Sequence, residues 1–195
     1  MMRNARPLIL ALAALPLLSG CFVAVVGGAA VGAGAAHDRR SFGTVFDDRN
    51  IQMSAYDNLN KDKELALKNN IYITVYNGVM LLSGEAGTEE LRRRAEERTR
   101  GFEGTRRIVN DIEVREPEGF WSRRRDNTIT AHVKTALLDI VDLPGFDPTR
   151  VNLTTTHRTV YLMGMLTHDE ADRVSEVVRN VSGVEKVTRV LEYKD

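Results

Sequence analysis

The chain holds a single cysteine, Cys21, and the residues before it have the order of an export signal. Arg3 and Arg6 form a short basic region, an apolar run from Pro7 to Leu18 follows, and the small pair Ser19-Gly20 leads directly to the thiol. Basic, apolar and small regions in this order are typical of a secretory signal. One cysteine excludes an internal disulfide. The sequence therefore predicts an exported protein whose only thiol stands at the cleavage point.

The tetrapeptide Leu18-Ser19-Gly20-Cys21 resembles the lipobox of bacterial lipoproteins. The resemblance implies that residues 1–20 are a signal peptide, that Cys21 is diacylated on sulfur, and that a third acyl chain, such as palmitate, is added to its freed amine. Two or more acyl chains make a stable membrane anchor. The alternative is a transmembrane helix, because the stretch from Pro7 to Ala36 is uncharged and long enough to span a bilayer. Pro16 and several glycines weaken that alternative.

The composition argues against several classes of function. Residues 21–195 carry 25 basic and 27 acidic side chains, so no strong field favours nucleic acid. The histidines do not have the spacing of a metal site such as H-E-x-x-H, and there is no nucleophile elbow or phosphate loop. The histidines are His37, His132, His157 and His168. We therefore expect a protein that is not an enzyme and has no metal, cofactor or nucleic-acid partner.

The body of the chain contains an internal repeat. Residues 71–74 align with 151–154, and residues 82–84 align with 162–164, both at an offset of 80. Upstream, Ile51, Ala55 and Leu59 align with Ile129, Val133 and Leu137 at an offset of 78. The change of offset falls in the intervening loop, where length changes are tolerated. The sequence thus predicts two copies of one small fold.

Each copy has the pattern of two helices and three strands. In the second copy the first helix has apolar residues at i, i+4, i+7, i+8 and i+11 from Ile129, and Asp126 or Asn127 is its predicted cap. Asn77-Gly78 joins the two strands of the first copy as a hairpin. The second helices have predicted threonine caps and glycine stops: Thr88 and Gly104, Thr167 and Gly183. The order α-β-β-α-β predicts an α+β fold with helices on one face of a small mixed sheet.

This order, the glycine after the second strand, and the entry to the last strand at residues 183–187 resemble the BON domain family. Two copies behind a lipobox resemble outer-membrane lipoproteins with two BON domains. We assign residues 1–20 to the signal peptide, 21–45 to a lipidated Gly/Ala-rich tether, 46–115 to the first domain, 116–124 to a linker and 125–195 to the second domain. The residue after Cys21 is Phe22, and the resemblance implies sorting to the outer membrane because an inner-membrane retention signal has Asp there.

The resemblance implies that the second domain binds anionic phospholipid through its first helix and supports outer-membrane integrity from the periplasmic face. The family position that bears a tryptophan is Thr128 here, and Trp121 lies upstream of it. Aromatic residues beside arginines suit a membrane interface. The candidate lipid-binding residues are Phe120, Trp121, Arg123, Arg124, Arg125, Thr128, Lys134 and Leu138.

Several alternatives remain open on sequence grounds. Phe120 and Trp121 pack between the domains in one alternative and meet the membrane in the other. The loop Leu143–Phe146 either enters the membrane or folds over its own domain. The run Arg92–Arg94 is interpreted as a solvated helix face, because glutamates stand four positions before Arg93 and Arg94. The alternative function is an adaptor that binds an envelope protein partner without contacting lipid.

Overall fold

The computed structural model describes residues 38–194 of the chain. Residues 39–195 are one compact unit with its own hydrophobic cores. The predicted signal peptide, the Cys21 lipidation site and most of the predicted tether lie outside the described residues.

The first domain contains three helices and three strands. Its elements are α3 (Phe42–Asn60), α4 (Lys63–Lys68), β1 (Asn70–Tyr76), β2 (Val79–Ala86), α5 (Glu89–Arg98) and β3 (Arg107–Val114). The sheet order is β1-β2-β3, with β1 antiparallel and β3 parallel to the central strand. The short helix α4 is an addition that the sequence analysis did not predict. Its N-cap, Asp62, accepts hydrogen bonds from the backbone N–H groups of Glu64 and Leu65.

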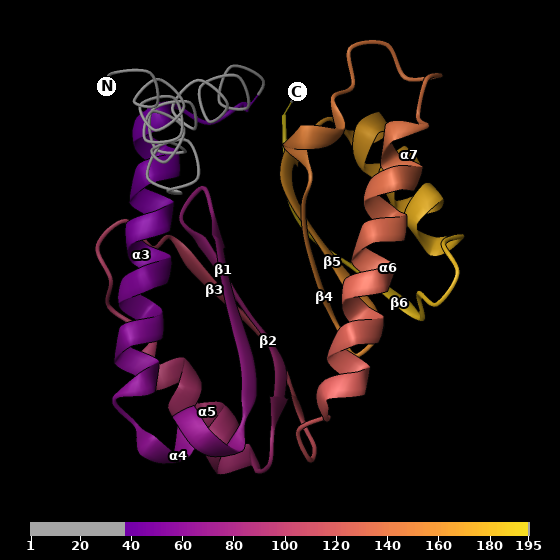
Figure 1. Ribbon diagram of the computed structural model, residues 1–195. Helices are drawn as coiled ribbons and strands as arrows, with labels where there is room; N and C mark the ends of the chain where they lie inside the picture. Colours follow the sequence, from indigo (N-terminus) through magenta and orange to yellow (C-terminus); the bar gives the residue numbers. More distant parts are fainter. Residues whose placement is uncertain (1–37, 195) are drawn as a thin grey trace, which may run out of the picture. The chain divides into compact units, whose positions relative to one another are not determined.

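The second domain repeats this arrangement with a 3₁₀ turn in place of α4. Its elements are α6 (Phe120–Leu138), η3 (Pro148–Arg150), β4 (Asn152–Thr156), β5 (Thr159–Leu166), α7 (His168–Arg179) and β6 (Lys186–Tyr193). The sheet order β4-β5-β6 has the same antiparallel and parallel pairings. The predicted α+β class, with a mixed sheet in each copy, is confirmed (Figure 1).

Each central strand is buried on both faces. In β2, Met80 and Leu82 pack in the core beneath the helices, whereas Val79 and Leu81 point to the opposite face. A further core cluster joins that face to Tyr161, Met163 and Val190 of the second sheet. Successive strand residues point to opposite faces, and both faces of β2 are covered. Its residues 79–82 are therefore all apolar instead of alternating with polar ones.

A buried aspartate on the first helix of each domain holds the hairpin turn. Asp48 accepts the backbone N–H groups of Asn77 and Gly78 at 2.6 and 2.8 Å. Asp126 accepts those of His157 and Arg158 at 2.9 and 3.0 Å. The prediction that Asp126 or Asn127 caps a helix is therefore wrong, because Asp126 lies within α6 and its carboxylate serves the turn instead.

Several predicted boundaries differ from the observed ones. Ser41 caps α3 through a hydrogen bond from the Thr44 N–H, so residues 42–45, assigned to the tether, are helical. Gly119 is the N-cap of α6, so residues 120–124, assigned to the linker, are also helical. No helix breaker stands between Phe120 and Leu138, which explains the early start.

The predicted threonine caps are confirmed, whereas the predicted glycine stops are not. Thr88 accepts the Leu91 N–H, and Thr167 forms a capping box with Glu170. The helices end earlier than the glycines, at Arg98 and Arg179. Gly104 and Gly183 have φ of 83° and 92° and lie in the turns that enter β3 and β6. Positive φ there favours glycine.

Candidate functional site

All eight candidate lipid-binding residues lie on α6, and all eight are exposed. The buried residues Ile129, Val133 and Leu137 recur every four positions, so one face of α6 packs onto its domain. Asp126 is buried as well, and most of the remaining positions are exposed. The exposed candidates are Phe120, Trp121, Arg123, Arg124, Arg125, Thr128, Lys134 and Leu138.

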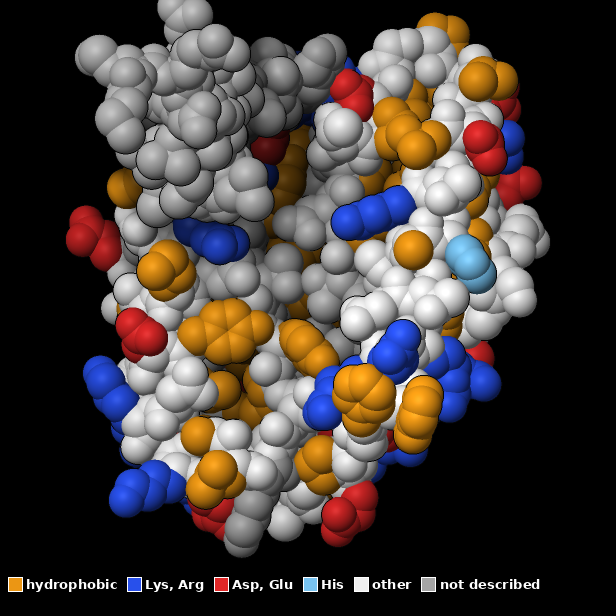
Figure 2. Space-filling model, viewed as in Figure 1, with side chains coloured by type: hydrophobic (Ala, Val, Ile, Leu, Met, Phe, Trp, Pro, Cys, Tyr) orange, Lys and Arg blue, Asp and Glu red, His pale blue; other side chains and the backbone are white. Residues whose placement is uncertain are grey.

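The first turns of α6 carry what we call the aromatic–basic cluster: Phe120, Trp121 and Arg123 to Arg125. The two aromatic rings meet edge to face, with centroids 5.5 Å apart. The guanidinium of Arg124 lies 5.6 Å from the centre of the Phe120 ring. Phe120 is 56% exposed and Trp121 is 77% exposed, which is unusual for large apolar side chains. In Figure 2, apolar side chains beside basic ones gather over the lower end of α6.

The positive charge of this cluster is not neutralised locally. Within residues 38–194, no ion pair joins Arg123, Arg124 or Arg125 to a carboxylate. The nearby Glu118 lies 3.6 Å from Arg115 and 3.3 Å from His157. Arg123 lies close enough to Tyr72 to influence it: burial raises the pKa of the Tyr72 hydroxyl, and the charge of Arg123 partly opposes this shift. The arginines are therefore available to an anionic ligand.

The remaining candidates form a separate group farther along α6. The Thr128 hydroxyl donates to the carbonyl of Arg124 at 3.0 Å. Lys134 lies ten residues after Arg124, and at about 1.5 Å per residue this places the two Cα atoms roughly 15 Å apart along the axis. Lys134 and Leu138 stand beside an apolar cavity instead. The structure thus divides the candidates between the two ends of the helix.

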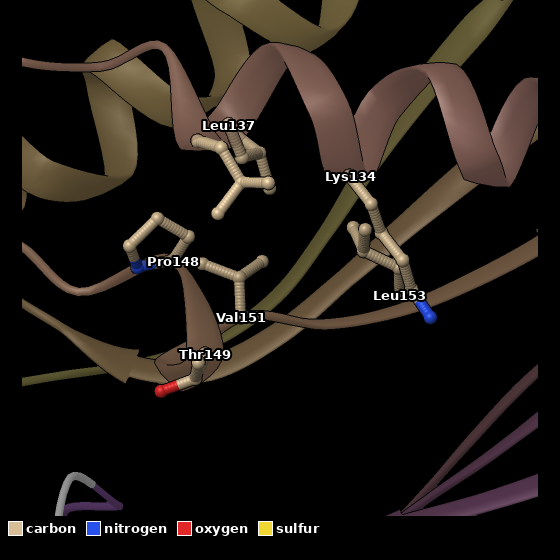
Figure 3. Close-up of a pocket in the computed structure, with 7 residues that line it drawn as sticks. Lys134, Leu137, Pro148, Thr149, Val151 and Leu153 are labelled. Atoms are coloured by element: carbon tan, nitrogen blue, oxygen red, sulfur yellow. The ribbon is translucent and has the colours of Figure 1, made fainter. Parts of the chain in front are cut away.

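The cavity lies between α6, η3 and β4 and has a volume of ≈ 370 Å³. Figure 3 shows Leu137, Pro148 and Val151 around it, and the stem of Lys134 running past Leu153 with its nitrogen at the outer edge. Leu138, which is 67% exposed, lies at its rim. An apolar hollow with one cationic group at its edge has the chemistry of a site for an anionic amphiphile.

The structure decides between the alternatives for the exposed apolar residues. Trp121 is not packed between the domains, because more than three quarters of its surface is exposed. Leu143 and Phe146, by contrast, are partly buried against the core of their own domain. That loop therefore folds over its domain.

The arginines of the Arg92–Arg94 run pair with acidic side chains, as the sequence indicated, but the partners differ from the predicted ones. Arg92 pairs with Glu89 at 2.9 Å, and Arg93 pairs with Glu90 and Glu97 at 2.7 and 3.2 Å. Arg94 instead reaches across to α4, where it contacts Asp62 at 2.5 Å and Glu64 at 3.0 Å. These arginines are neutralised by neighbours, in contrast to those of α6.

Sequence reasoning missed two features. The turn-holding aspartates Asp48 and Asp126 stand at the repeat offset of 78, a signal that was present in the alignment. Arg39 makes a bidentate contact with Glu170 at 2.6 and 2.8 Å and donates to the Met165 carbonyl, and no local pattern predicts a contact over such a separation.

Among residues 38–194, no group of three or more His, Cys, Asp or Glu is placed to hold a metal ion.

The fold defines an α+β protein made of two tandem α-β-β-α-β domains, with an exposed aromatic–basic cluster on the second. Residues 47–116 and 125–195 each match the BON domain, and the chain belongs to the BON domain family. No helix within residues 38–194 combines the length and the apolar character that crossing a membrane requires.

Two relatives share most of the chain. It is 30% identical over 190 residues to the outer membrane lipoprotein DolP of Haemophilus influenzae, covering 97% of each chain. It is 36% identical over 156 residues to the 21 kDa hemolysin of Actinobacillus pleuropneumoniae, covering 80% of this chain and 79% of that protein. The solved structure of CdsD, a structural protein of the type III secretion system of Chlamydia trachomatis, aligns at a TM-score of 0.28 with 16% identity over 75% of this chain and 63% of that chain. The relationship to DolP supports an outer-membrane-associated BON protein.

Proposed function

We propose that this protein is a lipid-anchored, periplasmic, non-enzymatic protein that binds anionic phospholipid through its second BON domain and supports outer-membrane integrity. The observation that carries the proposal is the aromatic–basic cluster on α6, where two exposed rings stand beside three arginines without carboxylate partners. Aromatic side chains favour the headgroup region, and guanidinium groups pair well with phosphate.

The expected affinity of the cluster is modest. Each basic residue near an anionic surface contributes about 1 kcal/mol, so Arg123 to Arg125 together contribute about 3 kcal/mol, and burial of the rings adds to this. Residues 126–195 contain 8 basic and 11 acidic side chains, so attraction depends on how the domain is oriented. Binding that is weak and local suits a protein held near the membrane by a covalent anchor, because tethering raises the effective concentration of the second contact.

Vesicle flotation of residues 39–195 tests the lipid contact. Vesicles containing phosphatidylglycerol or cardiolipin should carry the fragment, whereas neutral phosphatidylcholine vesicles should not, and raising the salt should release it. A variant with Phe120→Ser and Trp121→Ser should lose binding. The matched control is Arg92→Ala with Arg93→Ala, which removes two self-paired arginines of α5 and should leave flotation unchanged. Flotation that is absent at low salt, or equal for both variants, would refute the proposal.

The anchor is proposed at Cys21. Three acyl chains at that residue would hold the protein at the membrane whether or not the second domain binds lipid, so the two parts are tested separately. Mass spectrometry of full-length protein extracted from membranes should show an N-terminus at Cys21 and the added mass of three acyl groups. An unmodified thiol or an uncleaved leader would contradict this part of the proposal.

A second candidate function is an adaptor for envelope assembly machinery. It is favoured by an exposed apolar stripe on α3, formed by Phe42, Phe46 and Met53, which are each more than half exposed. These residues are spaced i, i+4 and i+11 and share one helix face. A partner protein that is retained in detergent by the native chain, and lost when Phe42 and Phe46 are replaced by serine, would favour this function.

A further inference from the structure

The two domains differ at one matched position beside the cavity of the second domain. Tyr56 on α3 and Lys134 on α6 are equivalent at the repeat offset of 78, as are Leu59 and Leu137. Tyr56 is partly buried against the core of the first domain, and its hydroxyl accepts the backbone N–H of Ile73 on β1 at 2.8 Å. In that domain, a side chain of the helix therefore covers the edge strand.

In the second domain that cover is missing. Leu153 on β4 is the counterpart of Ile73 at the offset of 80, and it lines the open cavity. Lys134 is exposed, and among residues 38–194 its amine has neither an ion pair nor a hydrogen bond to a side chain or carbonyl. With lysine in place of tyrosine, and with η3 in place of α4, the second domain has an apolar hollow with an unneutralised charge at its edge.

The surroundings of the hollow indicate its occupant. Its walls are aliphatic, from Leu137, Val151 and Leu153, and so fit a hydrocarbon chain better than a polar ligand. The amine of Lys134 adds a complementary charge for an anionic head group. Leu138 lines the rim and is 67% exposed, so the apolar surface continues from the cavity to solvent. An acyl chain can reach the hollow along that surface.

We propose that this cavity binds one acyl chain of an anionic phospholipid, with the head group paired to the amine of Lys134. The inference deepens the proposed function and rests on it for the choice of a membrane lipid as the ligand. It assigns a second lipid contact, distinct from the aromatic–basic cluster, which lies at the other end of α6. The cluster would meet the bilayer surface, whereas the cavity would hold an individual lipid molecule.

The test uses residues 39–195, which form a compact unit with their own cores, and a short-chain lipid below its micelle concentration. Dioctanoyl phosphatidylglycerol should bind saturably and give nuclear Overhauser contacts from its acyl protons to the methyl groups of Val151 and Leu153. Dioctanoyl phosphatidylcholine should bind more weakly. Lys134→Tyr copies the first domain and should abolish the acyl contacts, lowering affinity by at least about tenfold, equivalent to ~1.4 kcal/mol.

Two further variants separate this site from the rest of the helix. Lys134→Gln removes the charge and leaves the hollow open, so it should weaken binding by no more than about fivefold, the value of ~1 kcal/mol for one basic residue, and keep the acyl contacts. In vesicle flotation the two Lys134 variants should bind equally, because both remove the same charge and leave the aromatic–basic cluster intact. The Phe120→Ser, Trp121→Ser variant should show the reverse pattern, with flotation lost and short-chain lipid still bound.

Several results would overturn the inference. The native fragment could show no acyl contacts to Val151 and Leu153, or it could bind the charged and the neutral lipid with equal affinity. The acyl contacts could also persist in Lys134→Tyr. A cavity that excludes both lipids and instead shows contacts from a peptide paired along β4 would also overturn it. Loss of flotation with intact acyl contacts would count against the proposed membrane contact alone and would support the cavity.

Discussion

Replacement of Asp126 by alanine should loosen the hairpin between β4 and β5. Asp126 is 8% exposed, and its carboxylate accepts two backbone N–H groups of the turn, from His157 at 2.9 Å and Arg158 at 3.0 Å. Both turn residues have positive φ, at 49° and 59°, although neither is glycine. Such a backbone is unfavourable for residues with a Cβ atom, so the turn depends on external contacts of this kind.

The expected loss of stability follows from these two bonds. A hydrogen bond to a charged acceptor contributes about 1.5–3 kcal/mol, and removing the acceptor leaves two partly buried donors unsatisfied. Partial hydration of the turn and release of a desolvated carboxylate reduce the cost. We expect a loss of about 2–4 kcal/mol in the free energy of unfolding, which lowers the urea midpoint by roughly 1–2 M at a typical denaturant dependence.

Urea unfolding of residues 39–195, followed by circular dichroism, measures this change. Asn127→Ala is the matched control, because Asn127 is the exposed next residue of α6 and its loss should alter stability by no more than about 0.5 kcal/mol. Hydrogen exchange should quicken at the amides of residues 157 and 158 in Asp126→Ala. Equal midpoints for the two variants would refute the role assigned to Asp126.

Two more predictions concern stability. A Cβ atom at Gly84 would lie 1.9 Å from the Asn70 carbonyl oxygen, so Gly84→Ala should destabilise the first domain by about 3 kcal/mol or more. The control is Gly87→Ala: there is open space around Gly87, so this change should leave the urea midpoint nearly unchanged. Burial raises the pKa of Glu170, but hydrogen bonds from Arg39 and from the Thr167 N–H outweigh burial and hold that pKa below the usual 4.5. The stability that Glu170 contributes should therefore be complete above pH 4.5 and fall as the pH drops through its lowered pKa. Glu170→Gln should remove this acid-dependent step in urea midpoints measured across that range, and an unchanged step would contradict the assignment.

The repeating pattern allowed the fold to be predicted because local signals and the overall fold agree. Asn77-Gly78 requires a hairpin with positive φ at both positions, and both were found, at 49° and 70°. Thr167 is a helix cap as predicted, and it forms a capping box with Glu170. These features depend only on residues close in the sequence, so the sequence alone is sufficient to identify them.

The features that sequence reasoning missed depend on contacts between distant segments. Asp126 has the type and position of a helix cap, and only the return of the β4–β5 turn to α6 gives its carboxylate a different role. The cavity beside Lys134 could not be predicted either, because its walls come from α6, η3 and β4, which only the fold brings together. Exposure of Trp121 likewise depends on how α6 packs, which periodicity does not fix.

The central claim is that α6 of the second domain meets an anionic membrane. It is tested most directly by amide signals of residues 39–195 bound to phosphatidylglycerol nanodiscs that contain a nitroxide-labelled lipid. Paramagnetic broadening confined to the aromatic–basic cluster and the following turns of α6, and weakened in neutral nanodiscs, is the predicted result. Broadening centred on α3 or α5, or none at all, would contradict the claim.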